Sequence, residues 1–119
     1  LGVDNYHDLK QEDGHRDAIR KLHIVIAESK MRNKLSAFTE TGLENVKDMT
    51  WYPDVLGAVL NDSLVQNEIS YVMVWRNDPK VHFFFPYPGH PAEAGAKKLL
   101  ERKSIFLLSD YIKAKKNAK

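Results

Sequence analysis

The chain has 119 residues, 43% of them hydrophobic and 29% charged, which suffices for one domain with a packed core and a solvated surface. Its 18 basic and 16 acidic residues are interspersed and give a net charge of +2, so the charge pattern makes no case for nucleic acid binding. The lack of cysteine excludes disulfides, thiolate metal sites and cysteine nucleophiles. No apolar run approaches the ~20 residues of a membrane-spanning helix, and no signal peptide is visible.

The first half of the chain predicts a strand, a helix and a second strand. The opening "LGVDNY" is typical of the last residues of a strand followed by a polar turn. Apolar residues then recur at helical spacing with charges on the opposite side, which predicts a helix over residues 13–32. The run "LSAFTE", residues 35–40, predicts a buried strand that ends on a glutamate.

The second half repeats this alternation. Pro53 and Asp54 suit the first turn of a helix. The run "ISYVMVW", residues 69–75, is the strongest strand pattern, and because it is apolar on both faces we expect it in the middle of a parallel sheet. The aromatic, proline-rich residues 81–91 predict a loop, followed by a helix from Pro91 and a further helical stretch over residues 105–112.

Strands that alternate with helices indicate βαβ units and a parallel sheet. Three such strands alone would leave two open edges, and their apolar faces would need more cover than three helices provide. A (β/α)₈ TIM barrel has about 250 residues, so three βα units correspond to roughly its last third. We therefore expect residues 1–119 to form one C-terminal part of a barrel, with a compact three-layer α/β domain as the alternative.

Polar or aromatic groups stand at the end of each predicted strand, which is where barrels carry their catalytic residues. The three sets are Asp4, Asn5 and Tyr6; Thr39, Glu40 and Thr41; and Trp75, Arg76 and Asn77. Glu40, with hydroxyls, a tyrosine and an arginine nearby, would stay ionised and suit a nucleophile or general base. Trp75 offers a flat face for a sugar ring. Each residue alone has an ordinary structural explanation, but their joint placement predicts a glycosidase-like site.

Four segments carry a family resemblance: "GVDNYHD", "KLSAFTETG", "ISYVMVWRND" and "HFFFPYPGHP". In this order and spacing they resemble the C-terminal third of glycoside hydrolase family 26, whose members are mainly endo-β-1,4-mannanases on a (β/α)₈ barrel. The resemblance covers essentially the whole chain, from about strand six to the last helix, and implies no metal or cofactor.

The resemblance also implies roles for five residues. Glu40 matches the catalytic nucleophile, and Tyr6 matches the tyrosine that hydrogen-bonds and orients it. Asp4 matches a polar residue of the active-site floor. Trp75 matches a platform under the sugar at the cleavage point, and Arg76 matches a contact to the sugar on the non-reducing side.

The family's acid/base lies on strand four, and this chain contains no such segment. We therefore expect an upstream polypeptide to complete the barrel, and we expect the chain alone to be inactive. The implied substrate is β-mannan, with mixed-linkage glucan or xylan as alternatives, and the family implies a secreted, periplasmic or cell-surface location. A non-catalytic carbohydrate-binding fragment is a further alternative. An unrelated doubly wound domain is disfavoured because no glycine-rich phosphate loop follows a strand.

Other candidates carry less weight. The five histidines lack the spacing of a metal site. Trp51 is either a second sugar platform or a packing residue, and Tyr87 is either a contact to distal sugars or part of the barrel rim. Glu44 is a weak candidate acid, and the basic C-terminal tail from Tyr111 is read as a solvated helix end.

Overall fold

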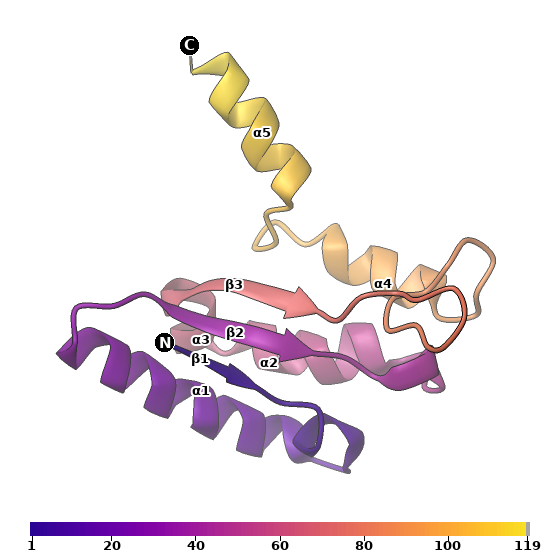
Figure 1. Ribbon diagram of the computed structural model, residues 1–119, viewed down its shortest axis with the longest axis horizontal. Coiled ribbons are helices and arrows are strands. Elements are labelled where there is room, and N and C mark those ends of the chain that lie inside the picture. Colours follow the sequence, from indigo (N-terminus) through magenta and orange to yellow (C-terminus); the bar gives the residue numbers. More distant parts are fainter. Residues whose placement is uncertain (119) are drawn as a thin grey trace.

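The computed structural model describes residues 1–118 and contains a parallel sheet of three strands in the order β1-β2-β3 (Figure 1). The strands are β1 at Gly2–Asp4, β2 at Ser36–Thr41 and β3 at Ile69–Val74. Both neighbouring pairs run parallel, because helical segments return the chain between successive strands. The sequence prediction of a parallel α/β sheet with these three strands is confirmed.

Five α-helices and three short helical turns connect and follow the strands within residues 1–118. The α-helices are α1 at Gly14–Met31, α2 at Gly57–Asn61, α3 at Ser63–Glu68, α4 at Glu93–Leu100 and α5 at Leu108–Asn117. The 3₁₀ turns lie at Asp8–Lys10 and Glu44–Val46, and a π-helical turn, Trp51–Leu56, runs into α2. Across the described part of the chain, none of the helices is both long and apolar enough to cross a bilayer.

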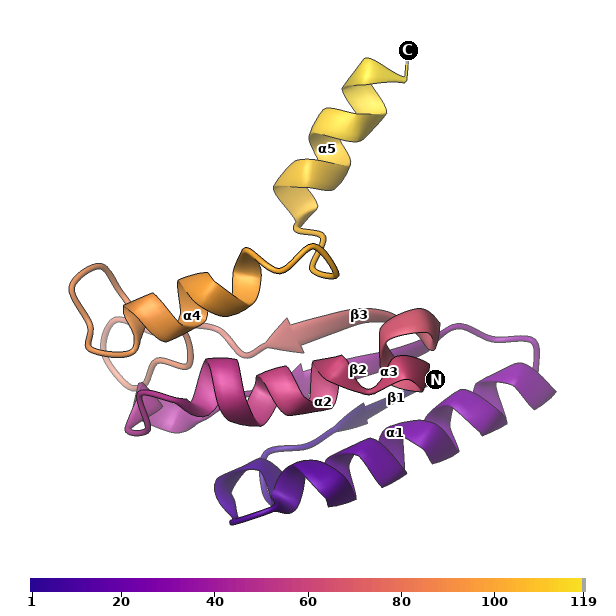
Figure 2. The ribbon, with the colours of Figure 1, turned by 180° about the vertical axis from the view of Figure 1, so that it is seen from behind.

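The hydrophobic core lies between the sheet and the helices α1, α2 and α3, which cover one face of it (Figures 1 and 2). Phe38 is fully buried at the centre of β2, and Leu22 of α1 and Val59 of α2 are equally inaccessible. Helix α1 turns its predicted apolar stripe toward this core, so the period of 3.6 residues correctly predicted both its extent and its buried face. Arg102, just after α4, donates to the carbonyl oxygens of Pro53 and Gly57 and so fastens α4 to the α2 segment.

The opposite face of the sheet carries no helix within residues 1–118. On β3, Val72 and Val74 pack against the core, whereas Tyr71 is 54% and Met73 39% exposed. Within the described part of the chain β3 pairs with β2 alone, so the expectation that β3 lies in the middle of the sheet is wrong there. The strand nevertheless has apolar side chains on both faces, which is the composition of a strand that is covered on both sides.

Two helix boundaries differ from expectation. The turn around Pro53 is π-helical, and regular α-helix begins only at Gly57. The last helix was predicted over residues 105–112, but α5 begins at Leu108. Its start is set by Asp110, whose carboxylate accepts the backbone N–H of Leu107 and so caps the first turn.

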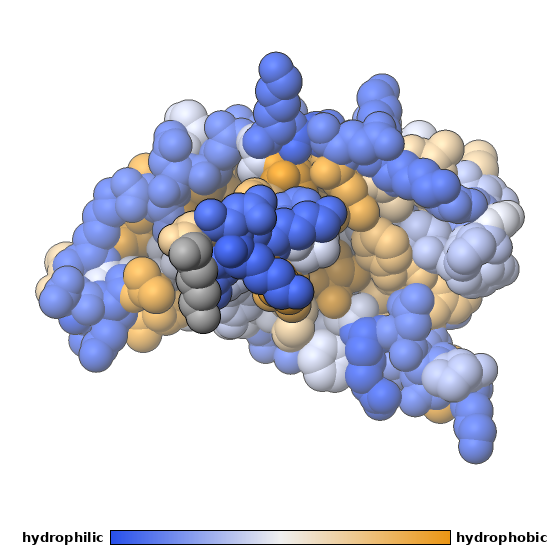
Figure 3. All heavy atoms as spheres, turned by 90° about the horizontal axis from the view of Figure 1, so that it is seen from above, coloured by the Kyte–Doolittle hydropathy of each residue, from blue (hydrophilic) through white to orange (hydrophobic). Residues whose placement is uncertain are grey.

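Helix α5 projects away from the body and buries none of its residues (Figure 1). Apolar residues remain exposed beside its hydrophilic side chains, as the space-filling view shows (Figure 3). A groove of about 330 Å³ lies between β3, the α2–α3 segment and the link from α4 to α5. Tyr71, Leu100 and Phe106 are among the residues that line it.

Candidate active site

The carboxyl ends of the three strands meet at one edge of the sheet. Backbone hydrogen bonds extend the pairing beyond the regular strands there: Asn5 N–H donates to the carbonyl oxygen of Glu40 at 2.9 Å. Trp75 N–H donates to the carbonyl oxygen of Thr41, also at 2.9 Å. The structure therefore brings the three predicted sets of strand-end residues together.

An extra residue in β2 sets the direction of Glu40. Val3 and Asp4 of β1 pair with Phe38 and Glu40, so β2 advances by two residues where β1 advances by one. The pairing with β3 shows the same excess: Phe38 to Thr41 spans three steps on β2 against two on β3. Such a bulge re-aims the side chains that follow it. Phe38 and Thr41 are fully buried, and Glu40 is only half-buried, because the bulge breaks the alternation between them.

Tyr6 holds the Glu40 carboxylate. Its hydroxyl donates to Glu40 Oε2 at 3.1 Å, joining residues that lie 34 positions apart in the chain. Burial of the phenol, together with the hydrogen bond to Glu40, raises the pKa of Tyr6 to about 12. Tyr6 therefore remains a protonated donor throughout the neutral range, and one carboxylate oxygen of Glu40 is fixed while the other is left for a reaction partner.

The two threonines beside Glu40 do not bind it. Thr39 donates its hydroxyl to Asp4 Oδ1 at 2.6 Å, and Thr41 donates to the carbonyl oxygen of Asn5 at 2.9 Å. The expectation that neighbouring hydroxyls hold Glu40 is correct only for Tyr6. These threonines instead tie the end of β2 to the end of β1 on both sides of Glu40, which fixes the backbone that carries it.

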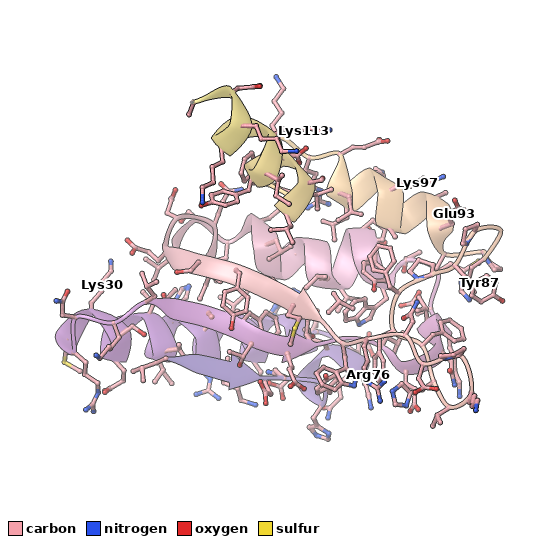
Figure 4. The ribbon with its side chains drawn as sticks, turned by 45° about the horizontal axis from the view of Figure 1, so that its top comes forward. Lys30, Arg76, Tyr87, Glu93, Lys97 and Lys113 are labelled. Atoms are coloured by element: carbon pink, nitrogen blue, oxygen red, sulfur yellow. The ribbon has the colours of Figure 1, made fainter. Side chains whose placement is uncertain are left out.

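The two predicted sugar contacts follow β3 directly. Arg76 pairs with Asp78 at 3.3 Å, and its side chain is 63% exposed at the end of the sheet (Figure 4). Within residues 1–118 Glu40 forms no ion pair. The expectation that Arg76 lies close enough to Glu40 to balance its charge is therefore not met, because Arg76 pairs with Asp78 instead. Trp75 is half-buried, which leaves part of the indole accessible.

The two further aromatic candidates, Trp51 and Tyr87, differ in their exposure to solvent. Trp51 is 1% exposed and donates its indole N–H to the carbonyl oxygen of Leu9 at 2.9 Å, so its interpretation as a sugar platform is wrong and it is a packing residue. Tyr87 is 53% exposed and packs edge-on against Phe83 and His90 in the loop before α4 (Figure 4). In the described part of the chain, no three His, Asp or Glu side chains gather as potential metal ligands.

A polar network behind Tyr6 was not recognised in the sequence. Asn5 donates to Asp8 Oδ2 at 2.7 Å and accepts the backbone N–H of Asp8, and Lys21 of α1 donates to the same carboxylate at 2.6 Å. These hydrogen bonds, that of Lys21 first, hold the pKa of Asp8 below its ordinary value. The available signal was the asparagine three residues before an aspartate, because such residues often bond locally to the backbone. The network fixes the turn that carries Tyr6.

Solved structures similar to this chain share this arrangement of strands and helices. GH26C from Muricauda sp. superposes with a TM-score of 0.80 at 26% identity over 92% of this chain. The GH26 β-mannanase BoMan26A from Bacteroides ovatus superposes with a TM-score of 0.76 at 30% identity, again over 92% of this chain. This chain is related to the family 26 glycoside hydrolases. No protein-family model and no curated protein sequence matches it.

The chain spans about a third of the length of these enzymes, 30% of the Muricauda protein and 31% of BoMan26A. It is thus an α/β parallel-sheet fragment of family 26 type. The resemblance found in "GVDNY", "TETG" and "VWRN" is confirmed at the level of the family. The catalytic and sugar-binding roles of Glu40, Tyr6, Asp4, Trp75 and Arg76 stay predictions, as does the assignment to strands six to eight.

Proposed function

We propose that this chain supplies the nucleophile half of the active site of a retaining glycoside hydrolase that cleaves β-1,4-mannosidic bonds. The observation that carries this proposal is the hydrogen bond from Tyr6 to Glu40 at the ends of adjacent strands, in a chain related to family 26. The description of BoMan26A as a β-mannanase is the reason for choosing mannan over mixed-linkage glucan or xylan.

In the reaction, the free carboxylate oxygen of Glu40 attacks the anomeric carbon, and the glycosidic bond breaks as a second carboxyl group protonates the leaving oxygen. That second group then takes a proton from water, the water oxygen attacks the anomeric carbon, and Glu40 leaves as a carboxylate. The two carboxyl groups must lie about 5–5.5 Å apart for this retaining route. Tyr6 keeps Glu40 oriented throughout, because its hydroxyl donates to the oxygen that does not attack.

The proposal includes an upstream polypeptide that completes the barrel and carries the acid/base. Within residues 1–118, β1 and β3 each have one unpaired edge, and Tyr71 and Met73 stand exposed on the uncovered face of the sheet. Unpaired apolar strands of this kind favour further strand pairing. Trp75 is proposed to form a platform under the sugar at the cleavage point, Arg76 to contact the sugar on the non-reducing side, and Asp4 to lie in the floor of the site. Because polymeric mannan does not cross membranes, the proposal also includes export.

Reducing-sugar release from soluble β-mannan by the full-length protein that contains this chain tests the proposal, with the intact mass measured alongside. Glu40→Gln should lower kcat about 10⁴-fold or more with binding nearly intact, because it removes the nucleophile. Glu44→Gln is the matched control, since Glu44 lies exposed in the loop four residues later, and it should keep full activity. Full turnover by the Glu40→Gln protein would refute the nucleophile assignment.

Tyr6→Phe tests the role of Tyr6 in orienting the Glu40 carboxylate separately from the role of Glu40 as the nucleophile. A hydrogen bond to a charged group contributes about 1.5–3 kcal/mol, so its loss should lower kcat about 10- to 100-fold while KM changes little. If the wild-type protein binds β-mannan without releasing reducing sugar, the non-catalytic carbohydrate-binding alternative holds instead.

A further inference from the structure

The side chain of Asn77 bonds across the loop that follows β3, in which Asp78 N–H also donates to the carbonyl oxygen of His82 at 2.7 Å. Its amide oxygen accepts the backbone N–H groups of Phe84 and Phe85, both at 2.9 Å, and its amide nitrogen donates to the carbonyl oxygen of Phe85 at 2.8 Å. Both lone-pair positions of the oxygen and one of the two N–H groups are therefore used on a single dipeptide. Few side chains other than asparagine offer an acceptor and a donor at this length.

Two further hydrogen bonds, from other parts of the chain, hold the backbone of residues 83 and 84. The Tyr52 hydroxyl donates to the carbonyl oxygen of Phe84, and Asn45 N–H donates to the carbonyl oxygen of Phe83 at 2.7 Å. The backbone N–H and C=O of Phe84 are thus both satisfied, the N–H by Asn77. A loop residue bonded in this way has a fixed backbone, and its side chain has a fixed direction.

The ring of Phe84 packs against Tyr6, the residue that hydrogen-bonds Glu40. Phe84 is 8% exposed and packs edge-on against the ring of Tyr6, with ring centroids 5.8 Å apart. On another side it touches Gly42, where an added Cβ would come within 2.6 Å of its ring. Tyr6 in turn donates to Glu40. A continuous series of contacts therefore leads from Asn77 through Phe84 and Tyr6 to Glu40.

We propose that Asn77 is a positioning residue for Glu40: it fixes Phe84, Phe84 fixes the ring of Tyr6, and Tyr6 orients the Glu40 carboxylate. The proposal rests on the proposed function for the role of Glu40, and it goes beyond that function by adding a residue whose side-chain hydrogen bonds go to Phe84 and Phe85. An alternative is that Asn77 acts on its chain neighbours Trp75 and Arg76. The two differ in outcome, because an effect through Tyr6 changes kcat and an effect through sugar contacts changes KM.

The first test uses the full-length protein on β-mannan. Asn77→Ala should lower kcat about 10-fold with KM within about twofold of wild type, because small misplacements of a reacting group are costly. Asn77→Asp keeps an acceptor oxygen for both N–H groups but turns its second oxygen toward the carbonyl oxygen of Phe85, so its kcat should fall between those of wild type and Asn77→Ala. The matched control is Asn67→Ala on α3, which loses one side-chain bond to the carbonyl oxygen of Ser63 and should be silent. A rise in KM with unchanged kcat for Asn77→Ala would overturn the proposal.

A double-mutant cycle tests the route through Tyr6. In a Tyr6→Phe background, where no hydroxyl is left to orient Glu40, Asn77→Ala should cost less than about twofold in kcat. If the effects of the two substitutions multiply in full, Asn77 does not act through Tyr6 and the positioning role fails. That result, combined with an inactive Glu40→Gln protein, would leave the proposed function standing, so the two failures are distinguishable.

The third test is independent of turnover and uses the full-length protein with its tyrosine, phenylalanine and tryptophan rings isotopically labelled. In wild type, nuclear Overhauser effects should connect the ring protons of Tyr6 and Phe84. In Asn77→Ala these should weaken severalfold, while those between Trp51 and Tyr52, whose centroids lie 4.9 Å apart in the core, persist as a sign of an intact fold. Unchanged Tyr6–Phe84 effects in Asn77→Ala would overturn the proposal, even if the full-length protein proved inactive.

Discussion

Gly42, two residues after the candidate nucleophile, is a position where a single added methyl group should be both conformationally strained and crowded. Its φ of +150° is one that residues with a Cβ rarely adopt, and strain of this kind costs about 1–3 kcal/mol. A Cβ there would also lie 2.6 Å from Phe84 Cδ1 and 3.2 Å from Phe84 Cβ, and overpacking of a buried contact costs about 1–3 kcal/mol more. Gly42→Ala should therefore lower the free energy of unfolding by about 2–6 kcal/mol.

Urea denaturation followed by circular dichroism measures this loss, and thermal melting should show Tm falling by roughly 8–24 °C. Gly89→Ala is the matched control, because Gly89 has a φ of +87° but no atom within 4 Å of an added Cβ. It should show the strain alone, about 1–3 kcal/mol. Equal losses in the two variants would refute the reasoning, since they would mean that Phe84 does not press on Gly42.

Two further predictions concern the supports of the sheet. At pH 7, Lys21→Met should lower the free energy of unfolding by about 1 kcal/mol, because Lys21 pairs with Asp8. Arg20→Met is the control and should lower it by less than about 0.5 kcal/mol, because the Arg20–Asp17 pair is exposed. The pKa of Asp8 is lowered in the folded state, so its contribution to the free energy of unfolding is complete above about pH 5 and is lost as the pH falls through that pKa. Lys21→Met should therefore make the free energy of unfolding fall less steeply as the pH is lowered below about 5. If the free energy of unfolding of Lys21→Met fell with acid as steeply as that of wild type, the stabilising role of the Lys21–Asp8 pair would be contradicted. Asp62→Ala removes the cap of α3, where Asp62 accepts two backbone N–H groups at 3.0 and 3.1 Å, and should cost about 1 kcal/mol by urea denaturation. Asp62→Asn should cost less than half of that, and equal losses would show that the charge matters rather than the cap.

The regular elements of this chain could be predicted from its sequence because they follow local periodicity. The apolar stripe of α1 repeats every 3.6 residues, and β2 and β3 are short apolar runs bounded by polar turns. The strand-end position of Glu40 and its proximity to Tyr6 follow from the parallel topology, since parallel strands end at the same edge. These features need no knowledge of distant contacts.

The remaining features depend on contacts that a linear pattern does not encode. The bulge in β2 adds one residue between Phe38 and Glu40 without any glycine or proline to mark it. Trp51 is buried because the carbonyl oxygen of Leu9, 42 positions away, accepts its indole N–H. Asn77 reads as an ordinary turn residue, and only the folded loop shows that Phe84 and Phe85 return to its amide.

Covalent trapping of the nucleophile tests the central claim most directly. A 2-deoxy-2-fluoro mannoside with a good leaving group should form a long-lived glycosyl-enzyme with the full-length protein, because it needs no acid catalyst for the first step. Trypsin should release residues 35–47, "LSAFTETGLENVK", as one peptide, and fragmentation would distinguish Glu40 from Glu44 within it. The account predicts that the sugar is attached to Glu40. Attachment to any other residue, or turnover of mannan with no covalent adduct, would contradict it.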